Sequence, residues 1–418
     1  MGERSVRKRR VMVAMTAGVC LCALGGWLPM ASAGEQAAPQ AAAKRTAQAA
    51  AVKAMRVHTL NVRGQWGADI SPDGRTVAVA VQKKDAASGE TSVDAELWDL
   101  RANRRLAQRT LSRRPLVAIT SAEWGQVRFT SDGKTLLIYD GELLHVLKAE
   151  SLEEITRVDL GLPAMPRVAQ VLSLAVPRNG RRAFAVLISQ GNGRGGAVRV
   201  YDLGTGALRR NWEFDKGFPE YGSRIAWSVD GKKIALSLLP MLPGDTLPRQ
   251  EKNLQVVNVD AGTVAGQWNT GYLAGPVAFA GENVVATATA EMAWKMQSGG
   301  GHPVRVWNAV TGRMVREIAS APSGVRGSLE ISADGRRVIG YVGDERSDEP
   351  QSDPESTIGI REQRFRVWAL PTWRVVATST PIQPNAPKRA QLRLSGKGDT
   401  VLVFWKFADT PLVVYEIP

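Results

Sequence analysis

The stretch Ile70-Ser71-Pro72-Asp73-Gly74-Arg75 decides the fold, because its pattern returns along the chain. Proline fixes one φ angle of a tight turn, and Gly74 can take the positive φ that other residues resist. A run rich in branched residues follows the turn, and a later strand ends in an aromatic or apolar residue near Asp or Asn. The pattern therefore indicates a repeated unit of turn and strands.

This unit occurs seven times. Its turn glycines are Gly74, Gly133, Gly180, Gly231, Gly281, Gly335 and Gly398. The strand positions that follow are Trp98, Leu147, Tyr201, Val257, Trp307, Trp368 and Tyr415, spaced by 49, 54, 56, 50, 61 and 47 residues. That spacing is typical of a four-stranded propeller blade with variable loops, and no stretch has a sustained helical period. We therefore predict an all-β, seven-bladed β-propeller with four-stranded antiparallel blades over residues 55–418.

The two ends of this region predict how the ring closes. The last strand-like run, residues 412–417, is followed only by Pro418, which leaves the seventh blade without a fourth strand. An additional strand-like run at 55–62 precedes the first blade. We expect this N-terminal strand to complete the last blade, and so to close the ring and hide the sheet edges.

The first residues have the pattern of a secretory signal peptide. A basic head precedes an almost wholly apolar stretch, Val11 to Met30, and the small residues Ala31-Ser32-Ala33 follow. We expect residues 1–33 to be cleaved and the protein to be periplasmic or secreted, by Sec export rather than the twin-arginine route. The alternative is a retained membrane anchor, because the apolar stretch approaches the ~20 residues that span a bilayer. Residues 34–54, rich in Ala and Gln, predict a flexible spacer.

Composition narrows the chemistry. Both cysteines, Cys20 and Cys22, lie in the leader, so the mature chain would have no disulfide, zinc–thiolate site or cysteine nucleophile. The formal charge is +14, and it would be +10 without the leader. Such an excess favours acidic partners. Because the basic residues are spread over all seven repeats, we expect no nucleic-acid partner, and an acidic glycan or lipid surface remains an alternative.

Three segments resemble the end-of-strand motif of the WD-repeat family and related bacterial propellers: Leu97-Trp98-Asp99-Leu100, Val200-Tyr201-Asp202-Leu203 and Val306-Trp307-Asn308-Ala309. The turn at 71–74 resembles that family's turn, and the resemblance covers roughly residues 55–418. The Gly-His element of typical WD repeats is missing, since the chain has only His58, His145 and His302. The buried His and Asp network of those blades is therefore not implied. The degenerate relatives, such as the periplasmic Tol-system propeller and cytochrome-like or surface-layer propellers, are nearer in character.

Candidate binding residues lie in the irregular loops. In a propeller these loops join the second strand of a blade to the third, or one blade to the next, and variable loops on a rigid scaffold are common binding sites. Met292, Trp294 and Met296 combine a large aromatic ring with two adaptable thioethers, which suits a partner contact. The alternative for Trp294 is that it covers the core of its own blade.

Signals for catalysis, metals or cofactors are weak. The carboxylates between Asp344 and Glu355 lack EF-hand spacing, so a solvated loop is the alternative to a calcium site. Residues 191–196 match a dinucleotide-binding glycine pattern but lead into a strand instead of a helix. The histidines lack metal-ligand spacing, and there is no Gly-x-Ser-x-Gly elbow. We expect no catalytic residue, metal or cofactor, although some propeller enzymes build channel sites from residues of many blades.

The predicted function is therefore that of an exported, non-enzymatic module. It would bind or scaffold another protein of the cell envelope, without a stable membrane span after cleavage and as a monomer. The first alternative is a propeller hydrolase or dehydrogenase with a channel-bound metal or quinone. The second is binding to an acidic glycan or lipid surface through the positive charge.

Overall fold

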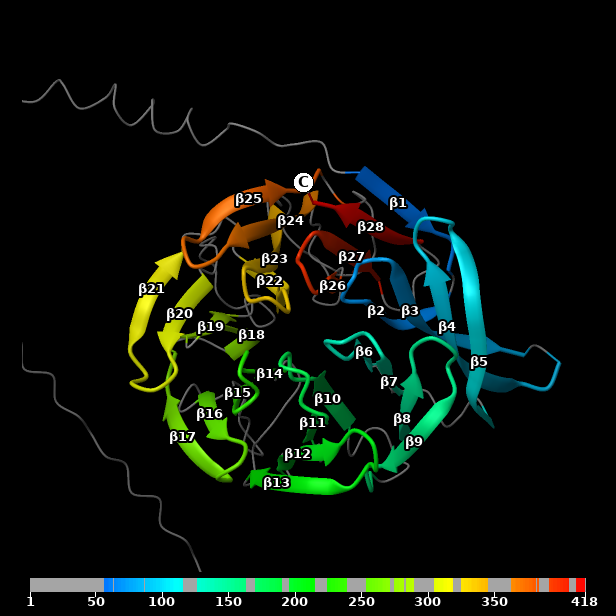
Figure 1. The fold of residues 1–418 in the computed structure, drawn as a ribbon, viewed down its shortest axis with the longest axis horizontal. Coiled ribbons are helices and arrows are strands. Elements are labelled where there is room, and N and C mark those ends of the chain that lie inside the picture. The colour runs from blue at the N-terminus through cyan, green and yellow to red at the C-terminus, as the bar shows by residue number, and fades with distance from the viewer. Residues whose placement is uncertain are drawn as a thin grey trace, which may run out of the picture. The chain divides into compact units, whose positions relative to one another are not determined.

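Four-stranded sheets arranged around a central axis make up the part of the chain that the structure describes (Figure 1). The structure is a computed structural model, and it describes residues 56–62, 64–85, 87–115, 126–162, 170–189, 195–214, 224–238, 253–270, 274–281, 283–288, 304–318, 325–344, 362–380, 382, 391–405 and 411–417. All of these residues belong to one compact unit, Val52–Pro418. In these ranges, no helix is long and apolar enough to cross a membrane.

The strands follow one another in groups of four. The first two groups are β2 (Gln65–Ile70), β3 (Thr76–Lys84), β4 (Glu90–Asp99), β5 (Arg104–Pro115), and β6 (Gln126–Phe129), β7 (Thr135–Tyr139), β8 (Leu143–Lys148), β9 (Glu154–Asp159). The next two are β10 (Gln170–Ala175), β11 (Ala183–Ser189), β12 (Gly196–Asp202), β13 (Leu208–Phe214), and β14 (Arg224–Trp227), β15 (Lys233–Ser237), β16 (Leu254–Asn258), β17 (Thr263–Trp268). Then come β18 (Ala274–Ala280), β19 (Asn283–Ala288), β20 (Val304–Asn308), β21 (Met314–Ile318), and β22 (Val325–Ile331), β23 (Arg337–Asp344), β24 (Glu362–Ala369), β25 (Arg374–Thr378). The final sheet combines β26 (Gln391–Leu394), β27 (Thr400–Phe404) and β28 (Leu412–Glu416) with β1 (Arg56–Leu60).

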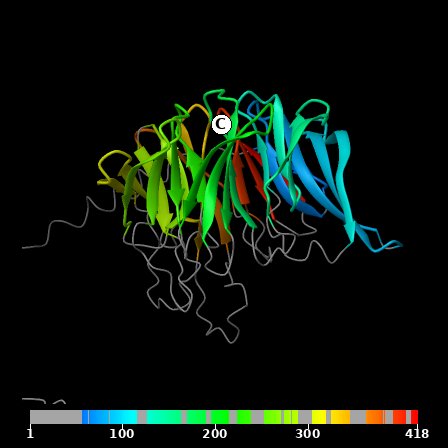
Figure 2. The same ribbon diagram turned by 90° about the horizontal axis from the view of Figure 1, so that it is seen from below.

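Each of these sheets is a blade of the propeller. Neighbouring strands are antiparallel, the first strand of each group lies nearest the axis, and the last lies at the rim (Figure 1). The prediction of an all-β propeller with four-stranded antiparallel blades is confirmed. Figure 2 shows the disc from the side, with many of the described turns at its upper face and the tip of the β3–β4 hairpin at the lower right. We call the upper face the turn face, because it carries the turns between the first and second strands of the blades.

The repeated turn has the geometry that the sequence pattern favours. In the first blade, Gly74 has φ +72° and its N–H donates to the Ser71 carbonyl oxygen at 2.9 Å. The Ser71 hydroxyl donates to Asp73 at 2.6 Å and accepts the backbone N–H of Thr76 at 2.9 Å. All seven turn glycines have φ between +69° and +76°. A side chain at these positions would strain the backbone, which explains why glycine recurs there.

The two ends of the chain's folded region meet in one sheet. Strand β1 pairs with β28, with Val57 opposite Tyr415 and Leu60 opposite Leu412. Leu60 and Leu412 are both fully buried, and they share a hydrophobic cluster with Ile70 of the first blade. The N-terminal strand therefore contributes both a strand to the last sheet and a side chain to the packing between the last blade and the first.

A buried histidine in the second blade was not anticipated. His145 on β8 is 2% exposed and lies 3.2 Å from Asp140 Oδ2 and 3.1 Å from Glu154 Oε2. Burial disfavours the charged imidazole, but the hydrogen bonds and charges of Asp140 and Glu154 outweigh it and raise the pKa of His145. Arg109 and Arg157 face the same Glu154 carboxylate, at 4.0 and 3.7 Å. The second blade thus carries a titratable charge in its core.

We expect Leu60→Ala to destabilise the whole unit. Leu60 lies at the junction of the last and first blades, and truncating a fully buried leucine costs about 2–5 kcal/mol. Val57→Ala on the same strand is the control: Val57 is half exposed, so its truncation should cost less than about 0.5 kcal/mol. Chemical denaturation of both variants, and of a chain lacking residues 55–62, measures this. Equal midpoints for Leu60→Ala and the parent would show that β1 is dispensable.

We expect His145 to make stability depend on pH. A group whose pKa is raised on folding contributes stability fully below its unfolded pKa of about 6.5, and that contribution is lost as pH rises through the folded value. The free-energy difference between the parent and His145→Gln should therefore shrink as pH rises from about 6 to 9. His58→Gln, which removes a half-buried histidine elsewhere, is the control. A difference that stays constant across this range would contradict a charged His145.

Candidate functional site in the central channel

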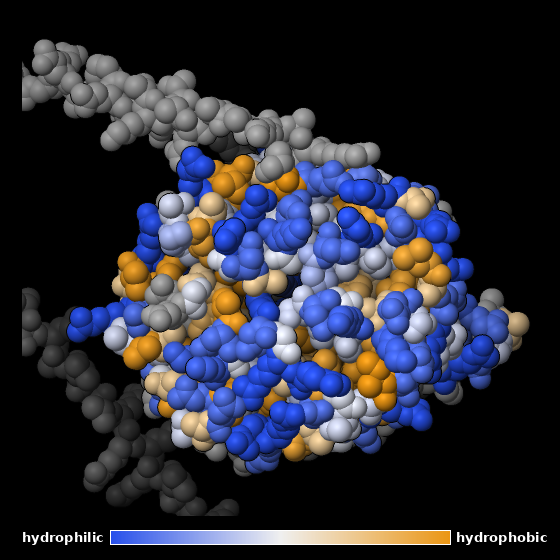
Figure 3. All heavy atoms as spheres, in the orientation of Figure 1, coloured by the Kyte–Doolittle hydropathy of each residue, from blue (hydrophilic) through white to orange (hydrophobic). Residues whose placement is uncertain are grey.

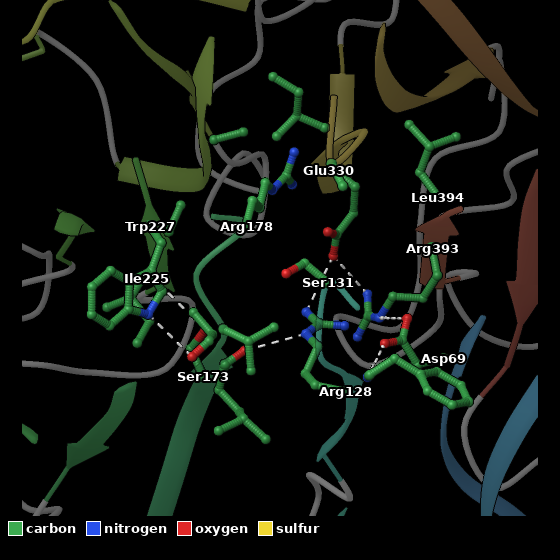
Figure 4. Close-up of a pocket in the computed structure, with 18 of the residues that line it drawn as sticks. Asp69, Arg128, Ser131, Ser173, Arg178, Ile225, Trp227, Glu330, Arg393 and Leu394 are labelled. Atoms are coloured by element: carbon green, nitrogen blue, oxygen red, sulfur yellow. Dashed lines mark hydrogen bonds and ion pairs between the residues drawn. The ribbon is translucent and has the colours of Figure 1, made fainter. Parts of the chain in front are cut away.

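The innermost strands bring together charged residues that are far apart in the sequence. Asp69 on β2, Arg128 on β6, Glu330 on β22 and Arg393 on β26 each lie five residues before a turn glycine. They therefore occupy the same position in four repeats. Because the first strand of each blade lines the axis, equivalent positions converge on the channel, as Figure 4 shows.

One carboxylate oxygen is shared by two arginines. Glu330 Oε1 accepts from Arg128 Nη2 at 3.2 Å and from Arg393 Nη1 at 3.0 Å (Figure 4). Arg128 belongs to the sheet that begins with β6, Glu330 to the sheet that begins with β22, and Arg393 to the sheet that contains β26. The ion pair between Arg128 and Glu330 thus joins blades that are not neighbours in chain order, and it crosses the channel instead of following the ring.

Burial and charge act in opposite directions on Glu330. Burial disfavours its ionised form, but the positive charges of Arg128, Arg393 and Arg178 outweigh this and hold the pKa of Glu330 below its ordinary value. The carboxylate is therefore negative at neutral pH. Its side chain is only 24% exposed, so the attraction to the arginines is weakly screened by solvent.

Asp69 is held differently. Its Oδ2 accepts the backbone N–H of Phe129 at 2.8 Å, which ties the first blade to the second. Its Oδ1 lies 3.9 Å from Arg393 Nε, at the limit of an ion pair. Burial raises the pKa of Asp69 above its ordinary value, against the opposing effect of Arg128 and Arg393. Asp69 is thus a weaker counter-ion to the arginines than Glu330.

Burial disfavours the charged form of two of the cavity arginines. Burial lowers the pKa of Arg393 to about 10 and that of Arg178 to about 10. Arg178 donates to the backbone carbonyl of Ser332, and Arg393 lies with its guanidinium carbon 5.6 Å from the centre of the Phe404 ring. Two buried donor atoms, Arg128 Nη1 and Arg393 Nε, have no hydrogen-bond acceptor in the described structure. Buried donors without acceptors are costly, so the site has unused capacity for an anion.

These side chains line a cavity of about 170 Å³. Its wall includes residues of β2, β6, β10, β14, β18, β22 and β26, together with the turn-face residues Pro72, Ser131, Pro177, Ala333 and Gly396. The charged lining consists of Asp69, Glu330, Arg128, Arg178, Arg224 and Arg393, a formal charge of +2. In Figure 3, which looks onto the turn face, a narrow hollow opens at the centre of the ring among hydrophilic residues. The cavity therefore concentrates positive charge at the axis, near that face.

The structure does not test the binding residues proposed from the sequence. Met292, Trp294 and Met296 lie outside the described residues, as does most of the acidic loop beyond Asp344. Of the glycine-rich segment, Gly196 begins β12, so that segment leads into a strand, as expected. The cavity is lined in part by residues of the turn face, which the sequence analysis did not propose as a binding surface. Among the described residues, no group of three or more His, Cys, Asp or Glu could hold a metal ion.

In the sequence, the charged cluster corresponds to one position of the repeat and not to a motif of consecutive residues. Most positions five residues before a turn glycine would be expected to be small or apolar, as Ala226 is in the fourth blade. Asp, Arg, Glu and Arg at this position in four repeats are out of character for strands that pack around an axis. Aligning the seven repeats on their glycines would have brought these residues into one column. The even spread of basic residues along the chain concealed their convergence in space.

No protein-family model matches the chain, and no curated protein matches it. A function has to be inferred from the geometry of the cavity.

We expect Arg128 and Glu330 to be energetically coupled across the channel. Both side chains are less than a quarter exposed, so a double-mutant cycle with Arg128→Met and Glu330→Met should give a coupling of about 1 kcal/mol or more. The pair Lys148 and Glu153, 2.7 Å apart but about half exposed, is the control and should couple much more weakly. Additive effects at 128 and 330 in urea denaturation would contradict the cross-channel ion pair.

Proposed function

We propose that this protein is an exported, non-enzymatic propeller that binds another protein of the cell envelope, and that its channel cavity receives an acidic group of that partner. The observation that carries this proposal is the composition of the cavity: four arginines face two carboxylates in a space of about 170 Å³. Arginine is suited to partner recognition because its planar guanidinium pairs with carboxylates in fixed geometry. A cavity with this charge attracts acidic groups and repels basic ones.

The same cavity offers little for catalysis. The charged side chains in the described wall pair with one another or with backbone groups, through Glu330, Asp69 and the Ser332 carbonyl. A catalytic set needs a nucleophile beside a base, with that base oriented by a third group. The two serines in the wall, Ser131 and Ser173, lie in a setting of arginines and apolar residues. Recognition therefore accounts for the arrangement better than group transfer does.

The proposal includes the architecture and location inferred from the sequence. We propose a ring of seven blades, closed by β1 in the last sheet, of the degenerate WD-repeat type found in bacterial envelopes. A signal peptide at 1–33, a spacer at 34–54 and a periplasmic or secreted location belong to the same proposal. The pairing of β1 with β28 and the recurring turn support the ring, while the leader pattern supports export.

Affinity capture from the native envelope tests the proposed function. Arg178→Gln removes one cavity charge without leaving either carboxylate of the cavity without its arginine contact. We expect it to lower recovery of the partner about tenfold, since loss of one member of a buried charge contact costs affinity on this scale. Arg313→Gln is the matched control, because Arg313 is exposed in a turn at the rim. Equal recovery by all three proteins would remove the cavity from the interface.

The same capture tests the loop residues. Changing Trp294 and Met296 to alanine together should weaken recovery if the irregular loops add a second contact.

Analysis of metal and chromophore in the purified protein distinguishes a binding protein from an enzyme with a metal or quinone in its channel. A stoichiometric metal or quinone without a co-purifying protein would overturn the binding proposal.

A further inference from the structure

We infer that the channel cavity is a carboxylate-binding site, and that Glu330 is an internal counter-ion occupying part of it. This inference rests on the proposed function and names the chemical group that the cavity recognises: a side-chain or C-terminal carboxylate of a protein partner. Binding would require that Glu330 move from Arg128 and Arg393, or share them with the incoming group.

The hydrogen bonds of Glu330 support the inference that an incoming carboxylate can replace it at Arg128 and Arg393. It reaches both arginines with the same oxygen, Oε1, so the pairing is not the bidentate arrangement in which each guanidinium meets two carboxylate oxygens. Its side chain is 24% exposed, whereas that of Arg393 is 10% exposed. Glu330 is therefore the more exposed partner in its contact with Arg393.

The donors that remain define what the ligand contacts. Arg128 Nη1 and Arg393 Nε are buried and have no acceptor, and both lie on the guanidinium groups that hold Glu330. An incoming carboxylate has two oxygens and several lone pairs, so it can accept from both arginines at once. In Figure 4, Arg178 lies on the other side of Glu330 from Arg128 and Arg393. It adds a third positive charge close to the same point.

The size and the wall of the cavity favour a carboxylate of a peptide over a bulky polyanion. The cavity of about 170 Å³ is lined by strands from every blade, so it admits a single side chain or chain end and not a continuous polymer. The guanidinium groups belong to β6 and β26, and each of these strands is hydrogen-bonded along its length to the next strand of its own sheet. The site is therefore preorganised for one small planar anion.

Titration of purified protein with small probes tests this inference. The probes are a capped tripeptide with a central glutamate, a tripeptide with a free C-terminal carboxylate, and inorganic phosphate, all by calorimetry at constant ionic strength. Glu330→Gln removes the internal charge and keeps the size of the side chain. We expect it to tighten binding of a peptide carboxylate by about tenfold or more, the scale of one charge-assisted hydrogen bond. Arg393→Gln should abolish the binding.

Asp69→Asn is the matched control, because it removes the other cavity carboxylate. Asp69 lies 3.9 Å from Arg393 Nε and does not contact Arg128 by an ion pair in the described structure, so its change should tighten binding much less. Equal tightening by Asp69→Asn and Glu330→Gln would show a general charge effect and overturn the role of Glu330. Preference for phosphate over both peptides would overturn the ligand class. No binding to any variant would overturn the site, while loss of the partner by Arg178→Gln would still support the proposed function.

Discussion

Convergence of the innermost strands on one axis is the constraint on which the rest of this structure depends. A propeller places the first strand of every blade at the channel, so a residue type chosen at one position of the repeat meets its equivalents from other blades. Apolar residues at that position would pack against one another, and like charges would repel. Here acidic and basic residues alternate with one another, in the order Glu330, Arg393, Asp69 and Arg128, and the result is a network of ion pairs across the channel.

The numbers of positive and negative side chains in this network distinguish a purely structural role from a role in binding a ligand. A purely structural network would balance its charges, because an unpaired buried charge is costly. Three arginines, Arg128, Arg393 and Arg178, act on Glu330, and the carboxylates in the described wall are Glu330 and Asp69. Burial lowers the pKa of Arg178 and of Arg393, and two buried guanidinium nitrogens have no hydrogen-bond acceptor in the described structure. Buried features that cost stability are typical of sites that bind a ligand.

The sequence predicted the scaffold well because the scaffold depends on local chemistry. Gly74 and its six equivalents mark turns that need a positive φ, and serine and aspartate beside them form hydrogen bonds within the same few residues. The alternation of short β-rich runs with such turns leaves few other folds open. The strand at the N-terminus was also predictable, because the last repeat lacked a fourth strand and the run before the first repeat could supply it.

The cavity was not predictable by the same reasoning, because it depends on contacts between residues as far apart as Asp69 and Arg393. Each of these charges is unremarkable within its own repeat, and the chain contains 54 lysines and arginines in all. Only the arrangement of the innermost strands around an axis makes Arg128 and Glu330 partners, although 202 positions separate them. His145 shows the same limit on a smaller scale. The spacing of a single histidine does not indicate its partners, yet the hairpin of β7 and β8 and the next strand place His145 between two carboxylates. In a repeat protein, functional residues are therefore better sought in columns of equivalent positions than in consecutive motifs.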